Sequence, residues 1–152
     1  MADQKGAILA RNDGRLIRGL VGNYRIKAGA NDSAGALSVV ESEIVPGGRT
    51  VAHYHLKIYE SVFVSEGELR VRVGDAWTTQ TVGATILLPV GVVHAWENRS
   101  PAPARMVIIS TPAVDGFFEE MGVLVKNAPG GKPDLEQLRE LNRRYDFVLV
   151  AD

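Results

Sequence analysis

Short stretches in which apolar and polar residues alternate, separated by turns, dominate residues 7–112. The clearest is 68–73, where Leu69, Val71 and Val73 alternate with charged residues. Because successive side chains of a strand point to opposite faces, this pattern predicts a strand with one face in a core and the other in water. Further strands are predicted at 7–10, 16–27, 37–45, 60–65, 76–81, 85–88 and 106–111. This many short strands at close spacing predict an all-β sandwich or barrel.

Turn and helix signals complete the outline of the chain. Asn12-Asp13-Gly14 is a strong hairpin signal between the first two predicted strands. A short helix is expected over 114–121, with Phe117 and Phe118 on one side and Gly122 at its end. A second helix should begin at Pro133, and its apolar stripe consists of Leu135, Leu138, Leu141 and Tyr145.

Length and composition favour one domain with a small-molecule partner. The 152 residues are 45% hydrophobic, enough for one sizeable core. Seventeen basic and eighteen acidic residues leave a net charge of −1, which gives no electrostatic footprint for nucleic acid or an anionic membrane. The chain contains no cysteine, so disulfides and thiolate chemistry are excluded. The polar first residues lack a signal-peptide core and no apolar run is long enough to span a bilayer, which predicts a soluble, cytoplasmic protein.

The candidate chemistry lies in the histidines, of which the chain has three. His53 and His55 are separated by one residue, so on a strand both project to the same face and can share one ion. Glu60 opens the next apolar run, and its carboxylate could return beside the pair. His94 must arrive from elsewhere in the chain, after turns marked by glycine and proline. Three neutral imidazoles and one carboxylate suit a first-row divalent metal.

These residues belong to two longer motifs, Gly47-x5-His53-x-His55-x4-Glu60-x6-Gly67 and Gly83-x5-Pro89-x-Gly91-x2-His94-x3-Asn98. Both resemble the two signature motifs of the cupin superfamily at every defining position, and residues 36–112 resemble a cupin core throughout. Residues 134–145 also resemble the tail helix of small cupins similar to quercetin dioxygenase.

The resemblance implies a fold and a domain plan. We expect a cupin-type antiparallel β-barrel or jelly roll with short C-terminal helices, in one domain over 1–152. Its core barrel would cover about 36–112, the N-terminal strands 7–27 and the C-terminal helical region about 113–146. Because strand exchange between subunits is frequent in this family and the N-terminal strands need their edges covered, we expect a homodimer.

The resemblance also implies one metal ion per chain, held by His53, His55, Glu60 and His94. Such a set leaves one or two positions open, as in catalytic sites. Glu60 is the candidate catalytic residue, acting as a ligand and as the base that takes a hydroxyl proton. The glycines and Pro89 are interpreted as backbone devices, and Asn98 as a turn residue.

Five further residues are candidates for the substrate pocket. Residues that share the strand parity of Glu60 or His94 would point inward with these ligands. Apolar helix residues could close the barrel mouth. Core packing alone also accounts for residues of both kinds. The five candidates are Val62, Val64, Trp96, Phe117 and Phe118.

Three functions remain open at this stage. The leading hypothesis is an oxygenase similar to quercetin dioxygenase-like cupins, with iron, manganese, nickel, cobalt or copper and a phenolic or enolic substrate. The second is a non-redox cyclase, isomerase or lyase that uses zinc. The third is a non-catalytic binding barrel. A sugar-nucleotide epimerase or isomerase is less favoured, because no arginine or lysine of the central strands clearly shares the parity of the metal ligands. The sequence determines neither the metal nor the substrate.

Overall fold

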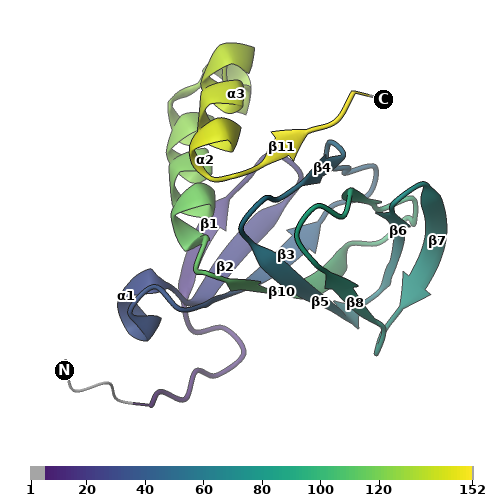
Figure 1. Cartoon of the computed structure of the whole chain (residues 1–152), viewed down its shortest axis with the longest axis horizontal. Coiled ribbons are helices and arrows are strands. Elements are labelled where there is room, and N and C mark those ends of the chain that lie inside the picture. The colour runs from purple at the N-terminus through teal and green to yellow at the C-terminus, as the bar shows by residue number, and fades with distance from the viewer. Residues whose placement is uncertain (1–5, 152) are drawn as a thin grey trace.

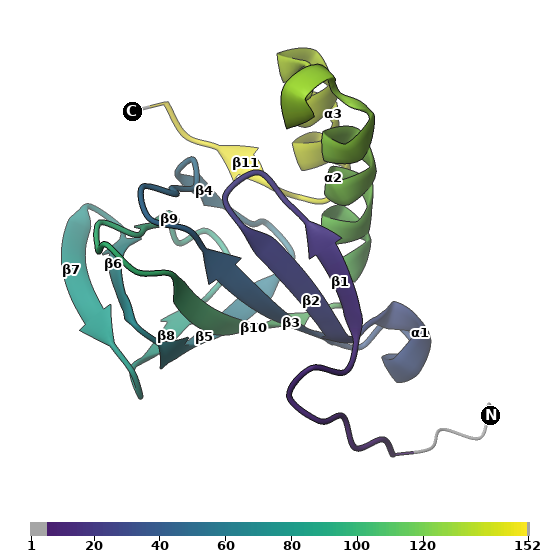
Figure 2. The same cartoon turned by 180° about the vertical axis from the view of Figure 1, so that it is seen from behind.

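The computed structural model describes residues 6–151. Residues 1–5, which belong to the polar start used in the signal-peptide prediction, lie outside the described part. Within these residues the chain forms two antiparallel sheets (Figures 1 and 2). The six-stranded sheet has the order β1 (Arg15–Arg18), β2 (Asn23–Ala28), β3 (Ser38–Ile44), β10 (Ala104–Thr111), β5 (Tyr59–Glu66) and β8 (Thr85–Leu88). The five-stranded sheet has the order β11 (Val148–Leu149), β4 (His53–Tyr54), β9 (His94–Glu97), β6 (Glu68–Val73) and β7 (Ala76–Thr81).

Helices occupy a small part of the described chain. A short α1 follows β2, and the others follow β10: α1 (Ala30–Ser33), α2 (Asp115–Asn127), the 3-10 turn η1 (Pro129–Gly131) and α3 (Leu135–Arg144). Figure 1 shows α2 and α3 stacked at one end of the sheets, with β11 returning from them to β4. Among residues 6–151 no helix combines the length and the apolar character needed to cross a bilayer.

The core lies between the sheets, where the predicted alternation places it. Along β3 every second residue is buried, from Ser38 to Ile44. Leu69 and Val71 of β6 are buried as expected, whereas Val73, at the strand end, is 38% exposed. The central apolar cluster includes Ile26, Val40, Val62, Leu69, Val71, Leu88, Met106 and Ile108. The expected all-β architecture with short C-terminal helices is therefore confirmed.

The N-terminal strands differ from the prediction. The hairpin turn lies at residues 19–22, where Gly19 N donates to Gly22 O at 2.8 Å, and not at 12–14. Gly22 is required because a Cβ there would lie 1.8 Å from Glu43 O. Residues 7–10 form no strand. The ammonium group of Lys27 donates to the carbonyls of residues 10, 11 and 13, which holds this segment over the sheet.

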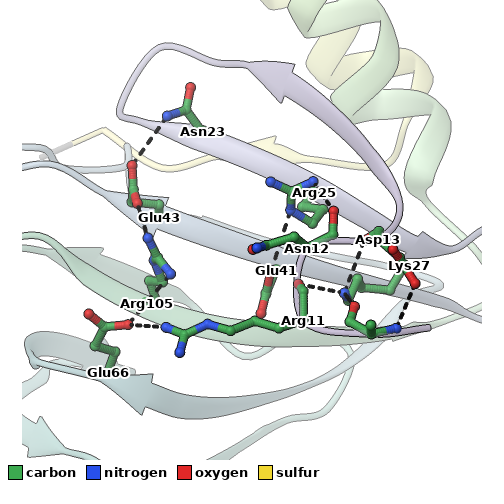
Figure 3. Close-up of polar contacts among 11 residues, drawn as sticks. Arg11, Asn12, Asp13, Asn23, Arg25, Lys27, Glu41, Glu43, Glu66 and Arg105 are labelled. Carbon is green, nitrogen blue, oxygen red and sulfur yellow. Dashed lines mark hydrogen bonds and ion pairs between the residues drawn. The ribbon is translucent and has the colours of Figure 1, made fainter.

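Ion pairs cover the outer face of the six-stranded sheet near this segment (Figure 3). Arg105 on β10 lies 2.8 Å from Glu43 on β3 and 3.5 Å from Glu66 on β5. Arg11 reaches the same Glu66 carboxylate at 3.3 Å. These partly exposed pairs contribute little stability individually. Of the three, the Arg11–Glu66 pair joins the N-terminal segment to the sheet.

The C-terminal helices also differ in their ends. The helix expected over 114–121 continues to Asn127, through Gly122. A Cβ at Gly122 would lie 2.3 Å from Ile17 Cγ2, so this glycine lets α2 pack closely on β1 and does not end the helix. α3 begins after Asp134, whose carboxylate accepts from Glu136 N and Gln137 N as an N-cap.

Candidate metal centre

Strands of both sheets bring the candidate ligands together. His53 begins β4 and lies directly opposite His94, the first residue of β9. His55 follows β4, two residues after His53. Glu60 comes from β5 in the other sheet. All four side chains are buried, with at most 5% exposure, so they meet in the interior between the sheets.

The ligand atoms are close enough to share one ion. One ring nitrogen from each of the three histidines lies within 4.8 Å of those of the other two. Glu60 Oε2 lies 3.4 Å from His94 Nε2 and 3.7 Å from His55 Nε2. The three histidines therefore form the cluster, and Glu60 approaches two of them.

Backbone carbonyls fix the orientation of each ring. Nδ1 of His53, His55 and His94 lies 2.9 Å from the carbonyl oxygen of Val51, Asp146 and Val92 respectively. A carbonyl oxygen only accepts, so each Nδ1 carries a proton and donates. The other nitrogen, Nε2, then remains for the centre, which is the arrangement typical of metal-binding histidines.

The site passes a simple test for a cation. Nε2 of His55, Nε2 of His94 and Oε2 of Glu60 are buried and have no hydrogen-bond partner among the described residues. Atoms with lone pairs at 3.4 Å repel each other unless a proton or a cation lies between them. A divalent ion fits this donor set, since neutral imidazole and carboxylate are ligands for first-row metals.

Ser110 on β10 supports the acidic member of the site. Its hydroxyl donates to Glu60 Oε1 at 3.1 Å, and the two residues face each other in the β10–β5 ladder. This bond occupies one carboxylate oxygen and leaves Oε2 facing the histidines. Sequence reasoning did not find Ser110, because a serine on an apolar strand has no motif.

The electrostatics follow from burial and from the proximity of the four groups. Burial, together with the nearby His94, lowers the pKa of His53 to about 3. Burial also lowers the pKa of His55, but the nearby Glu60 carboxylate outweighs it, so the net shift is upward. Burial raises the pKa of Glu60, and the opposing effect of His55 and His94 is larger and holds it well below its usual range. Glu60 is therefore ionised at neutral pH.

A largely apolar cavity of about 490 Å³ opens at this centre. His53 and Glu60 form part of its wall. The cavity is of the size that holds small-molecule ligands, about 300–1,000 Å³. Its aromatic lining consists of Tyr24, Trp96, Phe117, Phe118 and Phe147.

The structure places the five pocket candidates in two groups. Trp96, Phe117 and Phe118 line the cavity. Val62 and Val64 are not among its lining residues; they are 2% and 0% exposed. Their side chains share the inward register of Glu60, but β5 continues from Glu60 between β10 and β8, and Val62 packs in the apolar core cluster.

Other lining residues were missed by the sequence analysis. Phe147 stacks on Phe117 at 4.0 Å between ring centroids, and its ring also lies 5.0 Å from that of His53. Arg139 of α3 lines the cavity, as does Arg49. No spacing rule connects these positions to the histidines, because they meet only in the folded chain.

Comparisons with known proteins now identify the family. The cupin domain model matches residues 40–110, the segment that contains all four candidate ligands. Protein SchB of Streptomyces halstedii is 30% identical over 112 residues, which cover 70% of this chain and 78% of SchB. The protein is a member of the cupin superfamily.

Other proteins similar to this cupin differ from it in length. Germin-like protein 1-1 of Oryza sativa subsp. japonica is 28% identical over 124 residues, 71% of this chain but only 57% of the rice protein, so the cupin spans little more than half of that relative. The polyketide cyclase RemF from Streptomyces resistomycificus shares the fold with a TM-score of 0.62 at 20% identity, over 70% of this chain and 80% of RemF. These likenesses establish the jelly-roll fold and leave the reaction open.

Proposed function

We propose that this cupin is a metal-dependent enzyme acting on a small, mostly apolar substrate with a phenolic or enolic oxygen, and that the reaction is a dioxygenation. The observation that carries the proposal is the convergence of unpartnered histidine nitrogens and a carboxylate oxygen beside an aromatic-lined cavity. An apolar cavity with a few convergent polar groups is the usual form of a small-molecule site.

The chain's own residues would hold and orient the ion. His53, His55 and His94 offer Nε2, and Glu60 offers Oε2. When bound, the ion would supply a Lewis acid with open positions and, if it is iron, manganese, nickel, cobalt or copper, the redox chemistry that couples a substrate to dioxygen. The three Nδ1–H bonds to carbonyls keep the rings from turning away.

Glu60 limits the kind of substrate. Its lowered pKa keeps it ionised, as a ligand must be, and also makes Oε2 a weak base. Such a base would take the proton of a phenol or enol only where a bound ion lowers the pKa of that hydroxyl. Dioxygenation adds both oxygen atoms to the substrate, so the reaction needs no further reductant.

The cavity suits a planar molecule. Phe117 and Phe147 are nearly parallel, with 15° between their planes, and present a flat aromatic surface beside His53. Arg49, Arg139 and Asn142 also line the cavity and offer donors for further substrate oxygens.

Oxygen consumption is the direct test of this proposal. Protein loaded in turn with each redox-active metal should consume dioxygen in the presence of a flavonol or another enolisable phenol. Absence of turnover with all of these metals would count against a dioxygenase.

A second candidate keeps the same site but uses it without redox chemistry, as a cyclase, isomerase or lyase. The cavity volume and the fold shared with the polyketide cyclase RemF favour it. Activity under anaerobic conditions with zinc would support this candidate over the oxygenase. Full ligand binding by His53→Ala, with no turnover in the wild type, would instead indicate a non-catalytic barrel.

A further inference from the structure

The last described residues, 145–151, here called the C-terminal segment, lie against the metal centre. The segment leaves the end of α3 and forms β11, whose Leu149 pairs with His53 and whose Val148 pairs with Tyr54 (Figure 1). Its residues Phe147, Leu149, Val150 and Ala151 line the cavity. The segment is thus a wall of the site, far in sequence from the cupin motifs.

A helix-ending turn gives the segment its direction. Phe147 N donates to Asn142 O at 2.9 Å, and Asp146 N lies 3.5 Å from Arg143 O, which is the Schellman pattern. Asp146 occupies the left-handed position of this turn, with φ +63°. Glycine is the usual residue there, because a side chain disfavours this conformation. An aspartate at this position calls for another reason.

The carboxylate of Asp146 supplies that reason. Its Oδ2 accepts from Leu56 N at 3.0 Å and from Lys57 N at 2.7 Å. These two amides follow His55 directly in the chain. Glycine would permit the turn but could not join it to the loop after His55.

The backbone of the same residue completes the connection. His55 Nδ1 donates to Asp146 O at 2.9 Å. The other two metal-site histidines donate to Val51 and Val92, which lie two residues before them in their own loops. His55 alone depends on a carbonyl from a remote segment, 91 residues away.

We propose that Asp146 is a positioning residue of the metal centre: its left-handed turn and its carboxylate clamp place its own carbonyl on His55 Nδ1, and so keep His55 Nε2 directed at the ion. The C-terminal segment is then part of the centre and not an appendage of the helices. This inference rests on the proposed metal site.

The test compares the three histidines within one protein. Exchange of each imidazole Nδ1 proton with solvent is followed by ¹H–¹⁵N spectroscopy on metal-free protein, and zinc affinity is measured by competition with a chelator. In Asp146→Ala the Nδ1 proton of His55 should exchange about tenfold faster or more, as expected for loss of one hydrogen bond. The Nδ1 protons of His53 and His94 should remain protected.

Zinc affinity should fall in parallel. Loss of an outer partner of a ligating histidine typically weakens metal binding by about 10–100-fold, and Asp146→Ala should lie in this range. Asp146→Asn keeps a side-chain acceptor and a tolerance of the left-handed conformation, so it should restore much of the loss. Asp134→Ala removes the cap at the other end of α3 and is the matched control, with the His55 proton and zinc affinity unchanged.

The proposal is overturned if His55 Nδ1 stays as protected in Asp146→Ala as in the wild type, or if zinc affinity is the same in both. If Asp146→Ala does not fold, exchange is measured on the wild type alone. A His55 Nδ1 proton that is unprotected in the wild type would also overturn the proposal. A wild type that binds no zinc would refute the proposed function. The role of Asp146 in orienting His55 would still be tested, because proton exchange is measured on metal-free protein.

Discussion

Single buried atoms without partners give the candidate metal centre its chemistry. His55 Nε2, His94 Nε2 and Glu60 Oε2 lack hydrogen bonds among the described residues. Each such atom costs about 1–3 kcal/mol, and a domain is stable by only about 5–15 kcal/mol. A cation satisfies the three atoms together, which is the physical reason to expect one.

Removal of one imidazole should therefore weaken metal binding. His94→Ala leaves two histidines and a carboxylate, one donor fewer than the intact set, so zinc affinity should fall, and elemental analysis after dialysis against a competing chelator should find less than one ion per chain. Phe63→Ala, on the same strand as Glu60 but 42% exposed, is the control and should keep its metal. Equal metal content in the two variants would refute the site.

Acid should destabilise the metal-free protein through His53. Its folded pKa is lowered to about 3, whereas the unfolded imidazole titrates near its ordinary pKa of about 6.5. Between these values the unfolded chain binds a proton that the folded chain does not, so stability falls as pH decreases, by up to about 1.4 kcal/mol per pH unit.

Urea unfolding at pH 6.5 and pH 5 measures this effect, because both values lie above the ordinary pKa of Asp and Glu. His53→Gln cannot bind the proton and should lose less stability than the wild type over the interval. The raised pKa of His55 acts in the opposite direction in both proteins, so the difference between them isolates His53. An identical pH dependence would contradict the assignment.

At the scale of elements, α3 anchors the C-terminal segment to the barrel. Leu141 is fully buried, and it is the helix's only buried residue in the described chain, whereas Leu135 is 61% exposed. Tyr145 Oη donates to Glu120 Oε1 of α2 at 2.6 Å at the end of the helix. Leu138 also packs against the core, and Arg144 pairs with Glu120, so these contacts together hold the helix from which β11 departs.

Leu141→Ala should lower the free energy of unfolding by about 2–5 kcal/mol, as for other buried leucines. Leu135→Ala is the matched control on the same helix and should change it by less than about 0.5 kcal/mol, because the side chain is largely in water. Urea denaturation of the two variants provides the comparison. Similar losses in both would show that α3 does not dock through Leu141.

Element prediction succeeded where local signals agreed with the tertiary contacts. Asn98, interpreted as a turn residue, donates to Ile44 O and Ala102 O and accepts from Ser100 N. The hairpin signal at 12–14 and the helix end at Gly122 were wrong, since Lys27 and Ile17 decide those segments through contacts distant in sequence.

At the scale of the whole molecule, the centre connects the two sheets. Glu60 belongs to one sheet and His53 and His94 to the other. Zinc at about 100 times its dissociation constant should add about 2.7 kcal/mol to the free energy of unfolding, seen as a rise in melting temperature. Glu60→Ala should show a smaller rise at the same zinc concentration. An unchanged melting temperature of the wild type on addition of zinc would refute the coupling between zinc binding and the stability of the fold.

Association of two chains stays a prediction. β1 is the edge of the six-stranded sheet, and Leu16 on it is 61% exposed. An open edge with exposed apolar residues is usually covered, so we expect a homodimer at micromolar concentration. Light scattering that gives the mass of one chain would contradict it.

The sequence by itself determined the strand-rich fold and the pairing of His53 with His55, because side-chain alternation is a local property of a strand. It also indicated Glu60 and His94 as partners through the motif. Only the tertiary structure decided what surrounds them. Ser110, Phe147 and Asp146 reach the centre through contacts between segments 50 to 94 residues apart, and such contacts leave no periodicity or spacing in the chain.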